Sequence, residues 1–232
     1  MNLWTGRSTG ERAGIVAGAI AAILAVIFGV TEMGPPPRHG DGERAAARDG
    51  DAKGDPDAIE AAPLPFGTLD VLVLCQGTVV YKRGEFERPG WDKVMSVNLD
   101  SLMHISRKFK PQLLQSQGSV IIVSSISGLK ANIGNPAYAA SKAGAISLTK
   151  TLGQAWGPEG IRVNGLAPGL VDTKLTKVTT QSPERLAGAL ANIPQRRMGL
   201  PADMAGAAIF LASPLASYVT GHTLIVDGGL SL

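Results

Sequence analysis

From Leu69 onward the sequence alternates short apolar runs with longer stretches of helical periodicity, and this alternation limits the possible folds most strongly. Each run is apolar on both faces, as strands buried in a parallel sheet are. The runs cover residues 71–74, 120–124, 161–166 and 223–226. Helical periodicity covers residues 91–114 and 138–156 and returns after Pro201. Alternating strands and helices predict βαβ units with right-handed crossovers. We therefore expect an α/β fold with a doubly wound parallel sheet, whose ligands lie beyond the carboxyl ends of the strands.

Composition narrows the class of protein further. A hydrophobic fraction of 44% and a charged fraction of 18% are typical of a globular chain, and 232 residues suit a single domain. The net charge is only +3 and no basic stripe is interleaved with aromatic residues, so nucleic-acid binding is not expected. The three histidines have no metal-ligand spacing, so no metal site is expected either. Cys75 is the single cysteine, which favours a reducing, cytoplasmic location.

The first 65 residues differ from the rest in composition. Residues 13–30 form an unbroken apolar stretch after Arg7 and Arg12. This stretch is predicted to be a buried helix in the first half of a Rossmann-like domain, and the alternative is a membrane anchor. Residues 34–65 are rich in Gly, Pro, Ala, Arg and Asp and predict a linker or long loop. The expected organisation is an irregular N-terminal segment (1–33), a linker (34–65) and a catalytic core (66–232).

The clearest chemical signal is a tyrosine followed four residues later by a lysine. Tyr138 and Lys142 lie in a helical pattern that Pro136 opens, so both side chains should occupy one face of the helix. A lysine ammonium beside a phenol favours the phenolate, and we expect Lys142 to lower the pKa of Tyr138. Tyr138 is then a candidate general acid for reduction and general base for oxidation.

Two further polar residues stand where they can join this pair. Ser125 follows the buried strand that ends at residue 124, and its hydroxyl could bind and orient a substrate oxygen. Asn98 lies among apolar helical residues. A buried amide needs hydrogen-bond partners, so Asn98 has either a structural role or a functional one.

In their order and spacing these residues resemble the short-chain dehydrogenase/reductase family over residues 66–232. The resemblance implies that Asn98, Ser125, Tyr138 and Lys142 form a catalytic tetrad. In that tetrad Tyr138 transfers the proton, Lys142 binds the nicotinamide ribose, Ser125 polarises the carbonyl, and Asn98 holds a water in a proton relay. The implied cofactor is NAD or NADP, and the implied substrate is a small carbonyl compound or alcohol. Besides Tyr138 and Lys142, the implied cofactor-binding residues are Gly6, Gly10, Cys75, Gly77, Pro168, Gly169, Val171 and Thr173.

The sequence departs from the family pattern in two places. Where the family has Asn-Asn-Ala-Gly after a strand, this chain has Leu-Cys-Gln-Gly at residues 74–77, and Cys75 is interpreted as a small buried residue. Near the N-terminus, Gly6 and Gly10 match half of the dinucleotide-binding glycine motif, but Arg12 stands where its third glycine belongs. A remodelled or frame-shifted cofactor half is one hypothesis. An alternative function is that of a cofactor-deficient relative that keeps the scaffold for interactions.

Residues 173–198 occupy the position of the family's variable substrate loop. Ser182, Pro183 and Glu184 predict a helix start inside it, and hence a helical lid over the site. A 3-oxoacyl carrier-protein reductase is the nearest analogy for the substrate. The helices expected around residues 102–114 and 138–156 resemble those that pair subunits in the family, which implies a homodimer or homotetramer.

Overall fold

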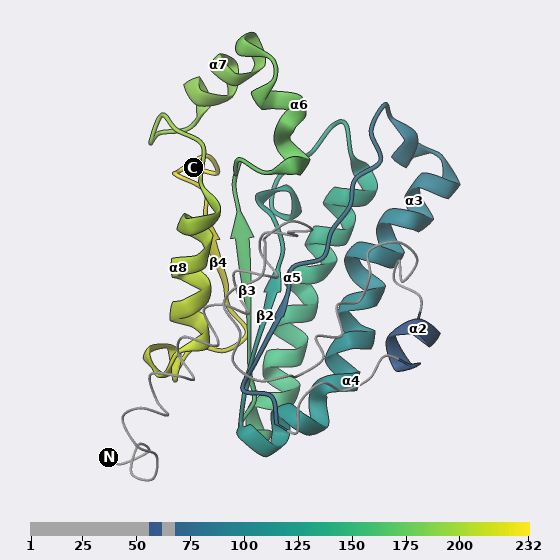
Figure 1. Cartoon of the computed structure of the whole chain (residues 1–232), viewed down its shortest axis with the longest axis vertical. Helices are drawn as coiled ribbons and strands as arrows, with labels where there is room; N and C mark the ends of the chain where they lie inside the picture. Colours follow the sequence, from purple (N-terminus) through teal and green to yellow (C-terminus); the bar gives the residue numbers. More distant parts are fainter. Residues whose placement is uncertain (1–55, 62–67) are drawn as a thin grey trace, which may run out of the picture.

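The structure is a computed structural model that describes residues 56–61 and 68–232. These residues form a four-stranded parallel sheet in the order β1-β2-β3-β4, with helices on both faces (Figure 1). The strands are β1 (Val71–Leu74), β2 (Ser119–Val123), β3 (Arg162–Pro168) and β4 (Thr223–Val226). All four predicted strands and the doubly wound sheet are confirmed. Strand β3 runs two residues beyond its predicted end because its pairing with β4 continues to Pro168 and Val226.

Alternate residues of the central strands face two separate layers of helices. Helices α4 (Ser101–Ser116) and α5 (Pro136–Trp156) cover one face of the sheet, and α8 (Pro201–Ala212) covers the other (Figure 1). Val120 and Ile122 belong to the core cluster under α4 and α5. Ile121, between them, belongs to the cluster under α8. This burial on both faces is why the strands have no polar alternation in the sequence.

The sequence predicts right-handed crossovers, but in the structure one of the three connections between strands has the opposite hand to the other two. The strand order advances in one direction through the sheet, yet α4 and α5 lie on one face and α8 on the other. The connection through α8 therefore has the opposite hand to the two before it, and the three cannot all be right-handed. A long excursion through α6 (Lys177–Thr180) and α7 (Pro183–Asn192) precedes α8, so it is not a short βαβ crossover.

The predicted helix over residues 91–114 is three segments in the structure. Helix α3 (Arg88–Met95) passes into a π-helical turn, η2 (Ser96–Asp100), and then into α4, which contains Pro111. The apolar periodicity predicted the helical path but not the π turn, which has no pattern of its own. Asn98 lies in this turn, and π turns inside helices often mark functional sites.

The remaining elements are short. The sequence motif at residues 182–184 correctly predicts the start of α7, because the Ser182 hydroxyl accepts a hydrogen bond from Arg185 N. Helix α2 (Pro56–Ala61) lies within the segment for which composition predicts a linker. The 3-10 helices are η1 (Gly84–Phe86), η3 (Ile126–Gly128), η4 (Gly157–Glu159), η5 (Lys174–Thr176) and η6 (Pro214–Ala216).

Residues 13–30, the candidate apolar helix or membrane anchor, lie outside the described residues. Within the part of the chain that the structure describes, no helix combines the length and the apolar character needed to cross a bilayer.

Candidate active site

Three of the four predicted tetrad side chains meet beyond the carboxyl end of β2. The Ser125 hydroxyl is hydrogen-bonded to the Tyr138 phenol. The Lys142 Nζ atom lies 5.7 Å from the centroid of the Tyr138 ring. Ser125 follows β2, whereas Tyr138 and Lys142 come from the first turns of α5. The fold therefore assembles a hydroxyl, a phenol and an ammonium at the sheet edge where a doubly wound fold binds its ligands.

Close backbone packing fixes α5 against the loop after β2. A Cβ atom on Gly128 would lie 2.6 Å from the carbonyl carbon of Lys142 and 2.7 Å from Ala143 N, so only glycine fits there. The Ser124 hydroxyl donates a hydrogen bond of 2.7 Å to the Lys142 carbonyl oxygen. These contacts hold the backbone of α5 beside the loop and thereby place Tyr138 next to Ser125.

Lys142 is a buried amine. Its side chain is 3% exposed, and Nζ donates a hydrogen bond of 2.9 Å to the carbonyl oxygen of Val123. Burial lowers the pKa of Lys142 to about 8, because it penalises the charged form, and the nearby Cys75 thiol partly opposes this shift. Lys142 is therefore mainly an ammonium at pH 7, but it can lose its proton under mildly alkaline conditions.

Tyr138 does not have the lowered pKa that the sequence led us to expect. Burial raises the pKa of its phenol, and the hydrogen bond from Ser125 only partly offsets this. Cys75, Glu85 and Tyr81 raise the pKa of Tyr138 further. The expectation considered the ammonium of Lys142 but not the desolvation of the phenol, which dominates here.

Asn98 makes the structural hydrogen bonds that its burial demands. The side chain is fully buried, its Oδ1 accepts from Thr78 N at 2.7 Å, and its Nδ2 donates to the Thr78 carbonyl oxygen at 2.9 Å. Nδ2 also donates to the Ser141 hydroxyl at 3.2 Å. Asn98 therefore clamps the loop after β1 to helix α5. The proton-relay role implied by the family resemblance stays a prediction.

Cys75 and Gly77 lie beside Lys142, and Cys75 is half-buried, not fully buried as the sequence led us to expect. A Cβ atom on Gly77 would come within 3.4 Å of the Lys142 Nζ atom and 3.9 Å of Asn98 Oδ1. Burial raises the pKa of the Cys75 thiol, and the charge of Lys142 lowers it in part, so the thiol stays protonated near neutral pH. Gln76, whose role the sequence did not reveal, turns away and donates to the Ser101 hydroxyl at 2.9 Å.

These residues fit the ribose end of a nicotinamide cofactor. Among the residues that the structure describes, one of the three N–H groups of Lys142 is bonded, to the Val123 carbonyl oxygen. The other N–H groups of this ammonium can donate hydrogen bonds to the hydroxyl groups of a ribose, and the neighbouring Gly77 has no side chain to block them. Gly6 and Gly10, predicted to contact the pyrophosphate, lie outside the described residues.

The other predicted cofactor residues lie at the carboxyl end of β3 and in the segment that follows it. Gly169 N donates to the Val226 carbonyl oxygen at 3.0 Å, and a Cβ atom on Gly169 would lie 2.6 Å from the Asp227 Cβ. Val171 forms an isolated parallel bridge with Gly199 and lines a cavity of about 410 Å³. Pro168 ends β3, and Thr173 precedes η5 as its cap.

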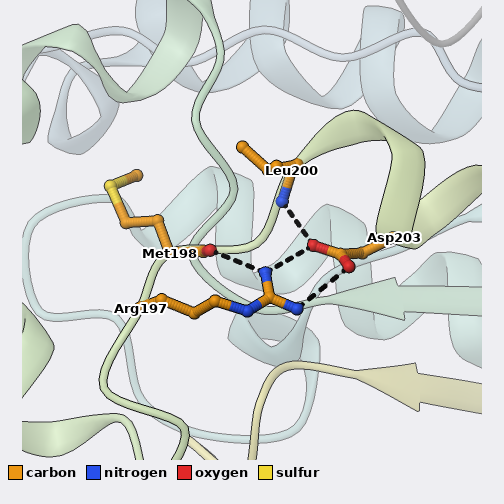
Figure 2. Close-up of polar contacts among 4 residues, drawn as sticks. All are labelled: Arg197, Met198, Leu200 and Asp203. Atoms are coloured by element: carbon orange, nitrogen blue, oxygen red, sulfur yellow. Dashed lines mark hydrogen bonds and ion pairs between the residues drawn. The ribbon is translucent and has the colours of Figure 1, made fainter.

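The predicted lid is tied down at both ends. At its start, the Tyr81 hydroxyl donates to the Leu175 carbonyl oxygen at 2.6 Å. At its end, the Arg197 guanidinium makes two bonds of 2.7 and 3.0 Å to the Asp203 carboxylate (Figure 2). Asp203 also accepts from Leu200 N at 2.7 Å and thereby caps α8. These bonds hold the pKa of Asp203 at about 2, the guanidinium being the largest cause.

Sequence reasoning missed Glu85 and Tyr81. Glu85 is fully buried and accepts a hydrogen bond from Tyr138 N at 2.9 Å. Tyr81 contributes to the raised pKa of Tyr138, so it also lies near the phenol. Both come from an irregular loop between β1 and α3, where no periodicity distinguishes a buried side chain from an exposed one. Nothing in the sequence alone would have separated Glu85 from its exposed neighbour Glu87.

The fold and this site together define a class, an α/β oxidoreductase with a Rossmann-like sheet and a Ser-Tyr-Lys site. Residues 51–231 match the family model described as enoyl-(acyl carrier protein) reductase. A 2-dehydro-3-deoxy-D-gluconate 5-dehydrogenase from Pseudoalteromonas atlantica is 39% identical over 173 residues, which are 74% of this chain and 68% of that protein. A 3-oxoacyl-(acyl-carrier-protein) reductase from Vibrio cholerae is 36% identical over 184 residues, 75% of this chain and 73% of that protein.

Solved structures agree with these sequence relatives. A gluconate 5-dehydrogenase from Burkholderia cenocepacia, crystallised with NADP and tartrate, matches with a TM-score of 0.69 at 32% identity. The match covers 76% of this chain and 69% of that one. The chain belongs to the short-chain dehydrogenase/reductase family. It is an NAD(P)-dependent oxidoreductase that transfers hydride between the cofactor and a carbonyl or secondary alcohol, and the comparisons give no support to the non-catalytic alternative.

Proposed function

We propose that Tyr138 is the proton donor in the reduction of a ketone and the acceptor in the reverse reaction. The observation that carries this proposal is the Ser125–Tyr138 hydrogen bond with the Lys142 ammonium 5.7 Å from the tyrosine ring. The raised pKa of Tyr138 keeps the phenol protonated near pH 7, which is the form that donates a proton. The nicotinamide cofactor supplies the hydride when it is bound.

The other site residues have supporting roles in this proposal. A carbonyl oxygen placed between the Ser125 hydroxyl and the Tyr138 phenol accepts a hydrogen bond from each, which polarises the carbonyl and fixes its orientation. As hydride reaches the carbonyl carbon, the phenol proton moves to the carbonyl oxygen. Lys142 stabilises the phenolate that remains and binds the ribose hydroxyls. Asn98 acts by holding the loop at Thr78, and its water relay is an additional role.

The proposed cofactor contacts are those that the family resemblance implies. Cys75 and Gly77 border the ribose beside Lys142. The segment 168–173, with Pro168, Gly169, Val171 and Thr173, borders the carboxamide of the nicotinamide. Residues 66–232 form the catalytic core in this proposal, and contacts of Gly6 and Gly10 with the pyrophosphate complete the cofactor site. Support for the described part comes from the two glycines, Gly77 and Gly169, where a Cβ atom would be close to a neighbour.

The substrate is proposed to be an anionic ketone. Exposed lysines lie next to both residues of the Tyr81–Leu175 contact. Lys82 follows Tyr81 in the sequence, and Lys174 and Lys177 lie close to Leu175 in the sequence. A cluster of positive charge at the rim of a site attracts negatively charged substrates. The named relatives act on sugar acids or on acyl groups of an acyl carrier protein, and both fit this charge. An acidic ketone is therefore expected to be reduced with a higher kcat/KM than a neutral ketone of the same size.

Oxidation of 2-dehydro-3-deoxy-D-gluconate, followed by formation of NADPH or NADH, and reduction of a 3-oxoacyl thioester, followed by their consumption, test the proposal. Tyr138→Phe should lower kcat by roughly 10²–10⁴-fold while cofactor binding, measured by nicotinamide fluorescence, is kept. Tyr218→Phe is the matched control, because Tyr218 is fully exposed at 103%. A Tyr138→Phe enzyme as active as the Tyr218→Phe enzyme would refute the role of Tyr138.

We also propose a cytoplasmic homodimer or homotetramer that associates through α4 and α5. Support comes from two exposed apolar side chains on α4, Met103 at 39% and Leu114 at 44%. The small side chains of α5, including Ala140 and Ala143, would allow two helices to approach closely. Light scattering of the purified protein measures the assembly directly, and a monomer at micromolar concentration would contradict it.

A further inference from the structure

The irregular loop between β1 and α3 carries a fully buried carboxylate, that of Glu85 in η1. Its Oε1 atom accepts hydrogen bonds of 3.0 Å from Val80 N and 3.0 Å from Asn135 Nδ2. Its Oε2 atom accepts a hydrogen bond of 2.9 Å from Tyr138 N. In the part of the chain that the structure describes, these partners are N–H groups that carry no charge. An ionised carboxylate at such a site needs several donors to offset its desolvation.

Helix α5 depends on this carboxylate for its N-terminal cap. Its N-cap residue, Asn135, makes no side-chain hydrogen bond to the helix, and its amide donates to Glu85 instead. Because Pro136 is the first helical residue, Tyr138 is the third, and its N–H is one that an N-cap side chain normally binds. Glu85 supplies that bond from 53 residues away in sequence. A negative charge is also favourable at this end of a helix.

A local cap stabilises only the end of its helix, whereas a cap from a distant loop also fixes the position of the helix relative to that loop. The same carboxylate binds Val80 N and Tyr138 N, so it links the loop beside Tyr81 to the backbone that carries the phenol. We propose that Glu85 is a positioning residue of the active site, whose buried carboxylate caps α5 and thereby holds Tyr138 in place against the loop after β1. This inference rests on the proposed role of Tyr138 as the proton donor.

The charge of Glu85 gives the inference a readout that a purely structural contact lacks. The titratable and polar groups that face Tyr138 are Ser125 after β2, Lys142 on α5, Cys75 after β1, and Tyr81 and Glu85 in the loop. Glu85 is among those that raise the pKa of Tyr138. A neutral side chain at position 85 should therefore lower the pKa of Tyr138. Because better hydration of the phenol would lower it too, Glu85→Asp, which keeps the charge but shortens the side chain, separates the effect of charge from that of packing.

The test compares Glu85→Gln with Glu87→Gln, the same change at an exposed position two residues away. Glutamine keeps the shape of the side chain, but its NH₂ group must face at least one of the three N–H groups that donate hydrogen bonds to Glu85. We expect kcat to fall by roughly 10–100-fold, as for a slightly misplaced catalytic group, with KM for the cofactor within about twofold. Glu87→Gln should match the unaltered enzyme.

The pKa of Tyr138 can be measured without any substrate. The chain has three tyrosines, so tyrosinate absorbance titrations with and without Tyr138→Phe isolate the titration of this phenol. In Glu85→Gln the titration of Tyr138 should move to lower pH. Unchanged kcat together with an unchanged titration would overturn the inference.

Hydrogen exchange of the unaltered protein covers the case in which Glu85→Gln does not fold. The Tyr138 amide should be protected like amides inside α5, although the third amide of a helix has no partner within the helix. Exchange as fast as that of a solvent-exposed amide would overturn the inference. The two proposals can fail separately: an active Tyr138→Phe enzyme refutes the proposed proton donor, while the titration and exchange results still decide whether Glu85 caps α5.

Discussion

Replacing Lys142 with methionine tests how strongly burial destabilises its ammonium. Burial lowers the pKa of Lys142 to about 8 from its ordinary 10.5, which the unfolded chain retains. Below pH 8 both states are protonated, so the full cost of charging a buried amine is present. Between pH 8 and 10.5 the unfolded chain binds more protons than the folded one, so stability from this group rises with pH.

The size of the effect follows from the same pKa. Each unit of pH past the folded pKa is worth about 1.4 kcal/mol, and pH 9.5 lies roughly 1.5 units beyond it. Relative to Lys142→Met, the unaltered protein should therefore gain about 2 kcal/mol of unfolding free energy between about pH 7 and about pH 9.5. The hydrogen bond from Lys142 to the Val123 carbonyl oxygen is lost in the variant at both pH values, so it cancels in this difference.

Urea unfolding at the two pH values measures the difference. Both proteins should carry Cys75→Ala, because Cys75 is the one thiol in the chain and its own titration interacts with Lys142. A stability difference that stays constant to within about 0.5 kcal/mol would refute the reasoning, since such a lysine would have an ordinary pKa in the folded protein. A change of the opposite sign would mean that the fold stabilises the ammonium.

Two further predictions concern the surroundings of Lys142. Gly128→Ala should lower the free energy of unfolding by about 1–3 kcal/mol in urea unfolding, because the new Cβ meets the backbone at Lys142, 2.6 Å away. Gly134→Ala is its control, since nothing lies within 4 Å of that Cβ, and equal losses in the two variants would contradict the packing argument. Cys75, with its raised pKa, should react with iodoacetamide at pH 7 more slowly than glutathione, and more slowly still with saturating NADPH, as followed by mass spectrometry. A rate equal to that of glutathione would show that the pKa of the Cys75 thiol is not raised.

The sequence predicted those parts of the fold that depend on local pattern. The four strands were found because their apolar runs are short and buried on both faces, and helix α5 because Pro136 marks its start. The π turn at Asn98 was missed, since it inserts into a helix without changing the apolar periodicity on either side. The hand of the last connection was missed because it depends on which face α8 covers, and that is decided by packing against Ile121 and Leu166.

The residues of the site also divide into those that local sequence pattern predicts and those that depend on long-range packing. Tyr138 and Lys142 are four residues apart on one helix, so their proximity follows from helical geometry alone. Ser125 could be placed because it follows a strand whose carboxyl end is predictable. Glu85 could not, because its contact with Tyr138 spans 53 residues and starts in an irregular loop. Long-range contacts of this kind leave no periodic trace in a single sequence.

The error about Tyr138 has a physical lesson, since one cause acts on both members of the pair. Burial penalises any charged form, so it raises the pKa of the phenol and lowers that of the amine. The two pKa values therefore move in opposite directions and their order is reversed: that of Lys142 falls from its ordinary 10.5 to about 8, whereas that of Tyr138 rises from its ordinary 10. As the pH rises, Lys142 loses its proton before Tyr138 does. The state with a neutral phenol and a charged ammonium thus prevails near pH 7, and it is the state that can donate a proton and then stabilise the phenolate left behind.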